Sequence, residues 1–143
     1  MIVLHVDGPV RGKGRPRFSR KTGRVYTDRL TRVAEDRVRH AWEEEGRPRV
    51  EGPVEMEVTA VLARPGSHFK RDGELSAAGK RSQWPTKTPD LDNAVKIALD
   101  ALNRRAFTDD AQIVILRAVK RWASLGEPEH LEVRIVGIPV AAC

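Results

Sequence analysis

Apolar and polar residues alternate along several stretches of the chain, and this period of two is typical of a β-strand with one buried face. In the clearest case, Val54, Met56 and Val58 alternate with polar neighbours. The same alternation predicts strands over residues 2–6, 54–62, 112–122 and 131–138. Glycine, proline or acidic residues separate these stretches, so we expect four distinct strands.

Two other stretches carry apolar residues every three or four positions, which is the period of an amphipathic helix. The first is expected to begin after a cap at Thr27 or Asp28 and to end near Glu45. The second is expected to begin at Pro89, with Thr88 as its cap, because proline fits the first helical turn. Its buried stripe would consist of Leu91, Val95, Ala98, Leu99 and Leu102.

Two segments follow neither pattern and are rich in glycine, proline and basic residues. Residues 11–26 are expected to form an exposed loop or a short hairpin that turns near Lys21. Residues 63–88 form a longer irregular segment, and loops of such length are usually functional or disordered. We expect this second segment to be a flexible flap that faces the substrate.

The elements follow one another in the order β-α-β-loop-α-β-β. With 143 residues, the chain suits one domain with one core. We therefore predict a single domain over residues 1–143 of the α+β class, in which two main helices pack on a small mixed β-sheet.

Composition narrows the class of protein. Apolar residues make up 40% of the chain and charged residues 32%, which is ordinary for a globular domain. No apolar run approaches the ~18 residues of a membrane span, and the first residues lack the features of a signal peptide. The single cysteine, Cys143, can form no internal disulfide, and no cluster of cysteine and histidine suggests zinc. We expect a cytoplasmic protein.

The net charge is +6 and the isoelectric point is about 10.0, and the positive charge is concentrated near the N-terminus. Between residues 11 and 24 there are seven basic residues and no acidic one. Such a patch favours a polyanion, most often nucleic acid, although a solvated basic loop would have the same composition. The candidate DNA-binding residues are Arg11, Lys13, Arg15, Arg17, Arg20, Lys21 and Arg24.

Two aromatic residues, Phe18 and Tyr26, lie within or beside this basic segment. Aromatic rings next to basic side chains could stack on exposed bases of a nucleic acid. The structural alternative is that both rings anchor the segment to the hydrophobic core, and this is the arrangement that we expect.

Residues 89–112 contain the candidate catalytic chemistry. Asp90 and Asp92 stand at the start of the second helix, and Asp109 and Asp110 directly precede a predicted strand. If the helix and the strand begin at the same end of the fold, three of these carboxylates converge and repel one another unless a cation is bound. Such a group suits Mg²⁺ and phosphoryl transfer. The alternative is structural, because aspartates commonly cap helices and form turns.

Lys96 follows Asp92 by four residues, so the two side chains are expected to lie side by side on the helix. Its ammonium group could neutralise a phosphate or a leaving oxygen, or it could simply form a surface ion pair with Asp92. The candidate catalytic residues are therefore Asp90, Asp92, Lys96 and Asp110.

The sequence resembles the RusA-type Holliday-junction resolvases. The resemblance rests on PDLDNAVKIALDALN at residues 89–103 and FTDDAQIV at residues 107–114, and it is supported by KGRPRF and GRVYT in the basic segment. It implies a homodimeric α+β fold with a basic face that holds four-way DNA. It assigns metal binding to Asp90, Asp92 and Asp110 and an important role to Lys96, whereas Asn93, Asp100 and Asp109 match the pattern without an assigned role.

The resemblance implies an endodeoxyribonuclease, of a bacterium or a prophage, that resolves Holliday junctions in recombination and repair. Its paired nicks would leave 5′-phosphates, and its cofactor would be Mg²⁺, which Mn²⁺ can replace. Two alternatives remain. One is a non-catalytic nucleic-acid-binding protein, and the other is a nuclease with a broader range of branched substrates.

Overall fold

A four-stranded β-sheet organises the molecule, and its strands lie in the order β1-β6-β4-β5. The strands are β1 (Ile2–Asp7), β4 (Val54–Leu62), β5 (Ile113–Trp122) and β6 (His130–Gly137). β5 runs parallel to β4, whereas the other neighbours are antiparallel, so the sheet is mixed. The computed structural model describes residues 1–11, 17–26 and 28–141. All four strands expected from the alternating pattern are present, with ends that differ by a residue or so.

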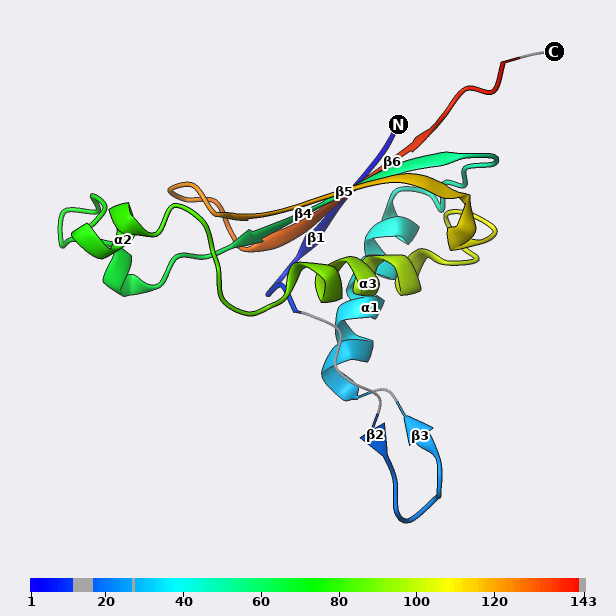
Figure 1. Cartoon of the computed structure of the whole chain (residues 1–143), viewed down its shortest axis with the longest axis horizontal. Coiled ribbons are helices and arrows are strands. Elements are labelled where there is room, and N and C mark those ends of the chain that lie inside the picture. The colour runs from blue at the N-terminus through cyan, green and yellow to red at the C-terminus, as the bar shows by residue number, and fades with distance from the viewer. Residues whose placement is uncertain (12–16, 27, 142–143) are drawn as a thin grey trace.

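Two long helices, α1 (Arg29–Glu44) and α3 (Leu91–Leu102), lie against one face of this sheet (Figure 1). The apolar stripes of both helices meet the inward residues of the strands. The core includes Leu4, Val38, Met56, Val58, Ile97, Leu102, Phe107, Val133 and Ile135. A mixed sheet with helices packed on it is an α+β fold, so the predicted fold class is confirmed. In the described ranges, no helix is long and apolar enough to cross a bilayer.

The start of α1 confirms one of the two expected caps. The Asp28 carboxylate accepts a hydrogen bond from the backbone N–H of Thr31 at 2.9 Å. This bond satisfies one of the N–H groups that the first turn leaves without a helical partner. The other candidate, Thr27, lies outside the described residues.

The start of α3 differs from the expectation. The N-cap residue is Asp90 rather than Thr88, and Pro89 precedes the helix instead of occupying its first turn. The reason is a contact distant in sequence. The Lys120 ammonium group donates to the backbone oxygens of Lys87, at 2.7 Å, and of Pro89, at 3.0 Å. These bonds hold the segment before Asp90 against β5, so the helix begins after it.

The basic segment near the N-terminus contains a hairpin of β2 (Arg17–Phe18) and β3 (Val25–Tyr26). The hairpin projects away from the sheet and the two long helices (Figure 1). Phe18 is 64% exposed and Tyr26 is 46% exposed. The expectation that these rings anchor the segment to the core is therefore wrong, because the hairpin holds them away from the core.

The segment between β4 and α3 is more ordered than its composition indicated. It contains the short helices η1 (Gly66–His68) and α2 (Ala77–Arg81). The Arg64 guanidinium group donates to the backbone oxygens of Gly79 and Ser82, each at 3.0 Å, and so joins the two ends of the segment. Gly79 also lies so close to the backbone of His68 that any Cβ would collide with it. These contacts have no local sequence pattern, which is why the segment was expected to be irregular.

β5 lies at the edge of the described sheet and exposes apolar side chains on both of its faces. Leu116, which pairs with the buried Met56 and so faces the helices, is 48% exposed, and Ile115 and Val119 are each 39% exposed on the other side. Val114, at the irregularity in the strand, is 62% exposed. Edge strands of soluble proteins usually carry charged or proline residues that discourage pairing. An apolar edge of this kind is typical of a surface that another chain covers.

Candidate active site

Asp90 and Asp92 lie together at the start of α3, and both are exposed. Asp90 occupies the N-cap position, but its side chain makes no capping hydrogen bond. The expected alternative, in which this aspartate serves only as a cap, is thus not what the geometry shows. Asp90 and Asn93 line a shallow hollow of about 400 Å³, beside Arg11. The carboxylates are also near the positive end of the helix dipole, where negative groups interact favourably with the helix.

Lys96 lies one turn further along the same helix and is exposed. Its side chain is close enough in sequence to reach Asp92, yet no ion pair joins these two described residues. An exposed ammonium group without that partner is available to a phosphate that approaches the carboxylates.

Asp109 and Asp110 have different surroundings although they are adjacent. Asp109 caps the short helix η2 (Asp110–Gln112), where its carboxylate accepts the N–H of Ala111 at 2.8 Å. The Gln112 side chain completes a capping box by accepting the N–H of Asp109 at 3.1 Å. For Asp109, the structural alternative is therefore the observed role.

Asp110 is not used as a cap. Partial desolvation, a hydrogen bond with Asp109 and the negative charges of Asp109 and Asp100 all raise the pKa of Asp110 above its ordinary value. The pKa of Asp109 is lowered instead, chiefly because it accepts the backbone hydrogen bond from Ala111. Three carboxylates thus lie close enough to influence one another here, and Asp110 is the one whose charge is least well compensated.

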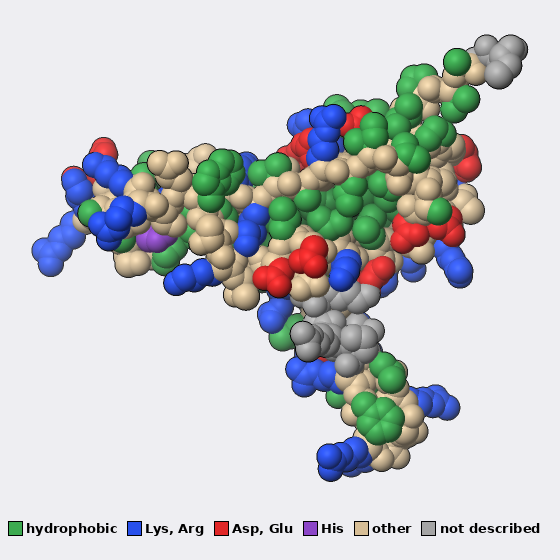
Figure 2. All heavy atoms as spheres, viewed as in Figure 1, with side chains coloured by type: hydrophobic (Ala, Val, Ile, Leu, Met, Phe, Trp, Pro, Cys, Tyr) green, Lys and Arg blue, Asp and Glu red, His purple; other side chains and the backbone are tan. Residues whose placement is uncertain are grey.

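The two acidic groups lie at opposite ends of α3. The start of α3 is held beside the end of β5, whereas η2 directly precedes the start of β5. The helix has 12 residues, so at ~1.5 Å per residue its ends are about 18 Å apart. Figure 2 shows acidic side chains over both ends of α3. The condition for convergence, that the helix and the strand begin at the same end of the fold, is not met within one chain, because α3 runs antiparallel to β5.

This separation matters for the expected metal ion. Among the described residues, no group of three or more His, Cys, Asp or Glu side chains is arranged to hold a metal. The structure brings Asp90 and Asp92 together but leaves Asp110 at the other end of the helix. Within one chain, Asp110 therefore does not join Asp90 and Asp92 in such a group.

The hairpin carries most of the described candidate DNA-binding residues. Arg17, Arg20, Lys21 and Arg24 are all exposed on it. Basic side chains protrude from both sides of this projection (Figure 2). Arg11 lies at its base and lines a hollow of about 440 Å³ together with Arg17, Arg29 and Tyr26. Lys13 and Arg15 lie outside the described residues.

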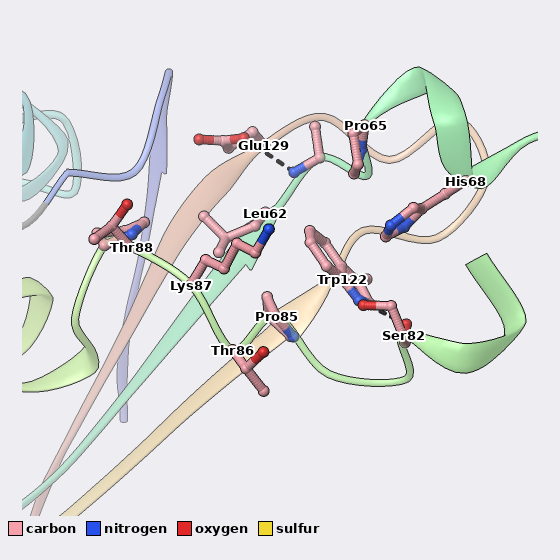
Figure 3. A pocket seen from close by; sticks show the side chains of 12 residues that line it. Leu62, Pro65, His68, Ser82, Pro85, Thr86, Lys87, Thr88, Trp122 and Glu129 are labelled. Carbon is pink, nitrogen blue, oxygen red and sulfur yellow. Dashed lines mark hydrogen bonds between the residues drawn. The ribbon is translucent and has the colours of Figure 1, made fainter. Parts of the chain in front are cut away.

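A further concave feature, which the sequence did not indicate, adjoins the Asp90 hollow. It is a cavity of about 510 Å³ over the ends of β4 and β5, and it includes Trp122 and Glu129 (Figure 3). Its residues come from four separate stretches of the chain. Only the position of a tryptophan at the end of a predicted strand could have drawn attention to it.

Comparison with known proteins is consistent with this arrangement. A protein-family model described as "Endodeoxyribonuclease RusA" matches residues 7–136. A curated relative, "Uncharacterized protein YqaN" of Bacillus subtilis (strain 168), is 32% identical over an alignment of 140 residues, and the match covers 94% of this chain and 94% of the relative. The family match includes both acidic groups, the hairpin, β4 and β5, and all of β6 except its last residue, and it begins at the end of β1. The chain therefore belongs to the RusA endodeoxyribonuclease family.

Proposed function

We propose that this protein is a Mg²⁺-dependent, structure-selective endodeoxyribonuclease that resolves Holliday junctions by paired nicks, with Mn²⁺ able to replace Mg²⁺. Membership of the RusA family supports a nuclease that acts on branched DNA and needs a divalent cation. The observation that carries the proposal is the exposed pair Asp90 and Asp92 at the start of α3, which makes no capping bond and lies beside Arg11. A basic hairpin on the same molecule suits the phosphates of DNA.

The proposal includes a homodimer, because one chain does not gather the three expected metal ligands. The apolar edge of β5 is the surface that we assign to the second copy. An isologous interface must be complementary to itself, and two exposed edge strands satisfy this condition when they pair in antiparallel fashion about a two-fold axis. Such pairing would bury Val114, Leu116, Ile115 and Val119, which are exposed in the single chain.

Antiparallel pairing also accounts for the separated aspartates. The start of each β5 then lies beside the end of the other β5. Asp110 stands just before the start of the strand, and Lys120, which holds Pro89 next to Asp90, stands near its end. Asp110 of one copy would come next to Asp90 and Asp92 of the other. We propose that each metal site is completed in this way.

In that site, Asp90, Asp92 and Asp110 of the second copy would hold the cation. The chemistry that Mg²⁺ supplies in such sites is activation of water for in-line hydrolysis of a phosphodiester, which leaves a 5′-phosphate. Lys96 offsets negative charge on the scissile phosphate. The arginines of the hairpin bind backbone phosphates, and the two-fold axis directs the two sites at opposed strands of the junction.

The direct test is cleavage of four-way, three-way and linear duplex DNA by the wild type and by Asp92→Asn. We expect the wild type to cut the four-way junction in preference to the other two. Asp92→Asn should lose at least roughly 100-fold in cleavage, because even indirect partners of metal ligands contribute that much. Its binding to the junction should be unchanged or tighter, since a negative charge near the DNA is removed.

A matched control is Asp36→Asn, which replaces an exposed helical aspartate that pairs with Arg39 away from the acidic groups. This variant should cleave like the wild type. Binding without any Mg²⁺-dependent cleavage by the wild type would indicate a non-catalytic binding protein. Equal cleavage of three-way and four-way DNA would indicate a nuclease for branched DNA in general.

A further inference from the structure

The cavity over the ends of β4 and β5 shares a wall with the Asp90 hollow. Thr88 and Pro89 line both, so a DNA strand with a phosphate at Asp90 passes the mouth of the cavity. We propose that the cavity receives one unpaired nucleobase of that strand, next to the scissile phosphate. This inference rests on the proposed function, because it assigns a second contact to the same DNA strand.

The walls of the cavity suit a flat aromatic ring. They are largely apolar and include Leu62, Pro65, Pro85 and Trp122 (Figure 3). The Trp122 indole is held in place, because its Nε1–H donates to the backbone oxygen of Ser82 at 2.9 Å. The His68 ring meets it edge-on at 5.3 Å, and Arg64, which is not part of this cavity, lies over the indole ring at 5.3 Å. A fixed indole is a good platform for base stacking.

One polar group at the cavity wall, the Glu129 carboxylate, is held in place by the backbone. The Glu129 carboxylate accepts the N–H groups of Val10 at 2.8 Å and Ala63 at 2.9 Å. A carboxylate can accept about four hydrogen bonds, so Glu129 retains capacity for a ligand. The side chains of Thr86 and Thr88 add hydroxyl groups at the wall. Apolar walls with a few placed polar groups are typical of sites that bind ring compounds.

The surrounding charge favours a nucleotide over a neutral ring compound. Residues 63–88, which form much of the cavity, contain six Lys or Arg residues and only two acidic ones. Several of these basic side chains, among them Lys80, Arg81 and Lys87, are exposed. They would draw the phosphates on either side of the inserted base toward the protein.

Only an unpaired base can enter such a cavity. A base within a duplex is stacked and paired, and its removal costs free energy that is smallest where pairing is already disrupted. At the point of strand exchange in a four-way junction, the stacking of neighbouring base pairs is interrupted, so this cost is lower there than within an arm. The cavity would therefore contribute to the preference for branched over linear DNA.

The test is a scan of abasic sites in a fluorescently labelled four-way junction, with affinity measured without divalent cations. One abasic site at a time is placed near the exchange point. At one position per cut strand, we expect loss of the base to weaken wild-type binding about tenfold, which lies within the range for stacking on an aromatic side chain. In Trp122→Leu the same abasic site should change the affinity by less than about twofold, because removal of the indole and removal of the base abolish the same stacking contact.

Two further variants separate stacking from general damage. Trp122→Phe keeps an aromatic ring but not the bond to Ser82, so it should retain most of the sensitivity to the abasic site. Trp84→Leu removes another tryptophan of the same segment, which is 59% exposed and does not line this cavity. In this control, the abasic site should still weaken junction binding about tenfold.

The outcomes are distinct. If no abasic site changes the affinity of the wild type while junction cleavage is intact, the inference is overturned and the proposed function stands. The same follows if Trp122→Leu keeps the wild-type sensitivity. If Trp122→Leu does not fold, the wild type and Trp122→Phe are compared instead. An affinity that no abasic site changes in either protein contradicts the inference. Failure of the wild type to bind or cut any branched DNA overturns the proposed function and this inference with it.

Discussion

At the scale of single residues, the adjacent aspartates before β5 show how one dipeptide takes two roles. Asp109 caps η2 and its pKa is lowered, whereas Asp110 makes no cap and its pKa is raised. A carboxylate that remains repelled by its neighbours weakens the fold of a single chain. Proteins commonly keep such unfavourable groups where function needs them.

The first prediction concerns the stability of Asp110→Asn. A carboxyl pKa that is higher in the folded than in the unfolded chain means that ionisation weakens the fold. This penalty is present above the folded pKa and disappears as the pH falls below the ordinary value of 3.8. Asp110→Asn should therefore have a higher Tm than the wild type at pH 7 and the same Tm near pH 3, as measured by thermal unfolding without divalent cations.

The neighbouring position is the control for that experiment. Asp109→Asn removes the carboxylate that accepts the Ala111 N–H, and the pKa of this group is lowered rather than raised. Its Tm at pH 7 should be lower than that of the wild type. A Tm of Asp110→Asn at or below the wild-type value at pH 7 would contradict the repulsion that we infer.

At the scale of elements, the hairpin of β2 and β3 behaves as an arm. It carries arginines and exposed aromatic rings and projects away from the sheet (Figures 1 and 2). Its two strands have only two residues each, so it contributes little to the core. The element is therefore suited to binding a partner rather than to holding the fold together.

A prediction for this element concerns the salt dependence of junction binding. Each contact between a basic side chain and a phosphate releases about 0.9 of a counterion. Replacing both Arg20 and Arg24 by alanine should therefore weaken binding and lower the slope of log affinity against log salt by about 1–2 units. The control replaces Arg47 and Arg49, which pair with Glu43 and Glu51 and lie outside the arm. An equal slope in the arm variant and the wild type would exclude the hairpin as the phosphate-binding element.

A second prediction at this scale concerns the turn between β5 and β6. Arg121 holds Glu127 through two hydrogen bonds of 2.7 and 2.9 Å. Together with the N–H of Ser124, this pairing lowers the pKa of Glu127 to about 2. The lowered pKa means that the stabilisation is fully present above the ordinary value of 4.5 and is lost as the pH falls toward 2.

Glu127→Gln should lower the free energy of unfolding at pH 7 by about 1 kcal/mol, a figure reduced for solvent screening of a partly exposed pair. Urea unfolding at pH 7 and near pH 3 should show the difference from the wild type shrinking at the lower pH. Glu51→Gln, which alters a pair of 3.3 Å at an exposed site, serves as the control and should have little effect. A difference that is constant with pH would mean that packing, not the ion pair, is responsible.

At the scale of the whole molecule, the orientation of α3 against β5 decides what one chain can do. It places Asp90 and Asp92 at one end of the helix and Asp110 at the other. It also leaves the apolar edge of β5 exposed. A second copy paired on this edge would resolve both features at once, which is the reason for proposing a dimer with shared sites.

The corresponding prediction uses mixed dimers. Asp92→Asn and Asp110→Asn should each be inactive alone. When the two are co-expressed, a mixed dimer contains one site with all three aspartates, so single-strand nicking of a junction should return. A mixture of Asp90→Asn and Asp92→Asn is the control, because no pairing of these chains restores a complete site. Absence of nicking from the first mixture, with dimers present, would contradict the shared site.

The sequence by itself determined the elements of this protein and the character of its two charged regions. The strands and long helices follow from the spacing of apolar residues, because burial of one face imposes a period of two or of about 3.6. The combined motifs at residues 89–103 and 107–114 were enough to indicate a resemblance to RusA-type enzymes. These features depend on residues close in sequence, so they can be predicted from the pattern along the chain.

Only the tertiary structure decided where these groups lie relative to one another. The bonds from Lys120 to the segment before Asp90 and from Trp122 to Ser82 join residues 30 or more positions apart. They set the direction of α3, form the cavity beside Asp90 and separate Asp110 from the other two aspartates. The periodic spacing of apolar residues does not indicate such contacts, because they depend on how whole elements pack.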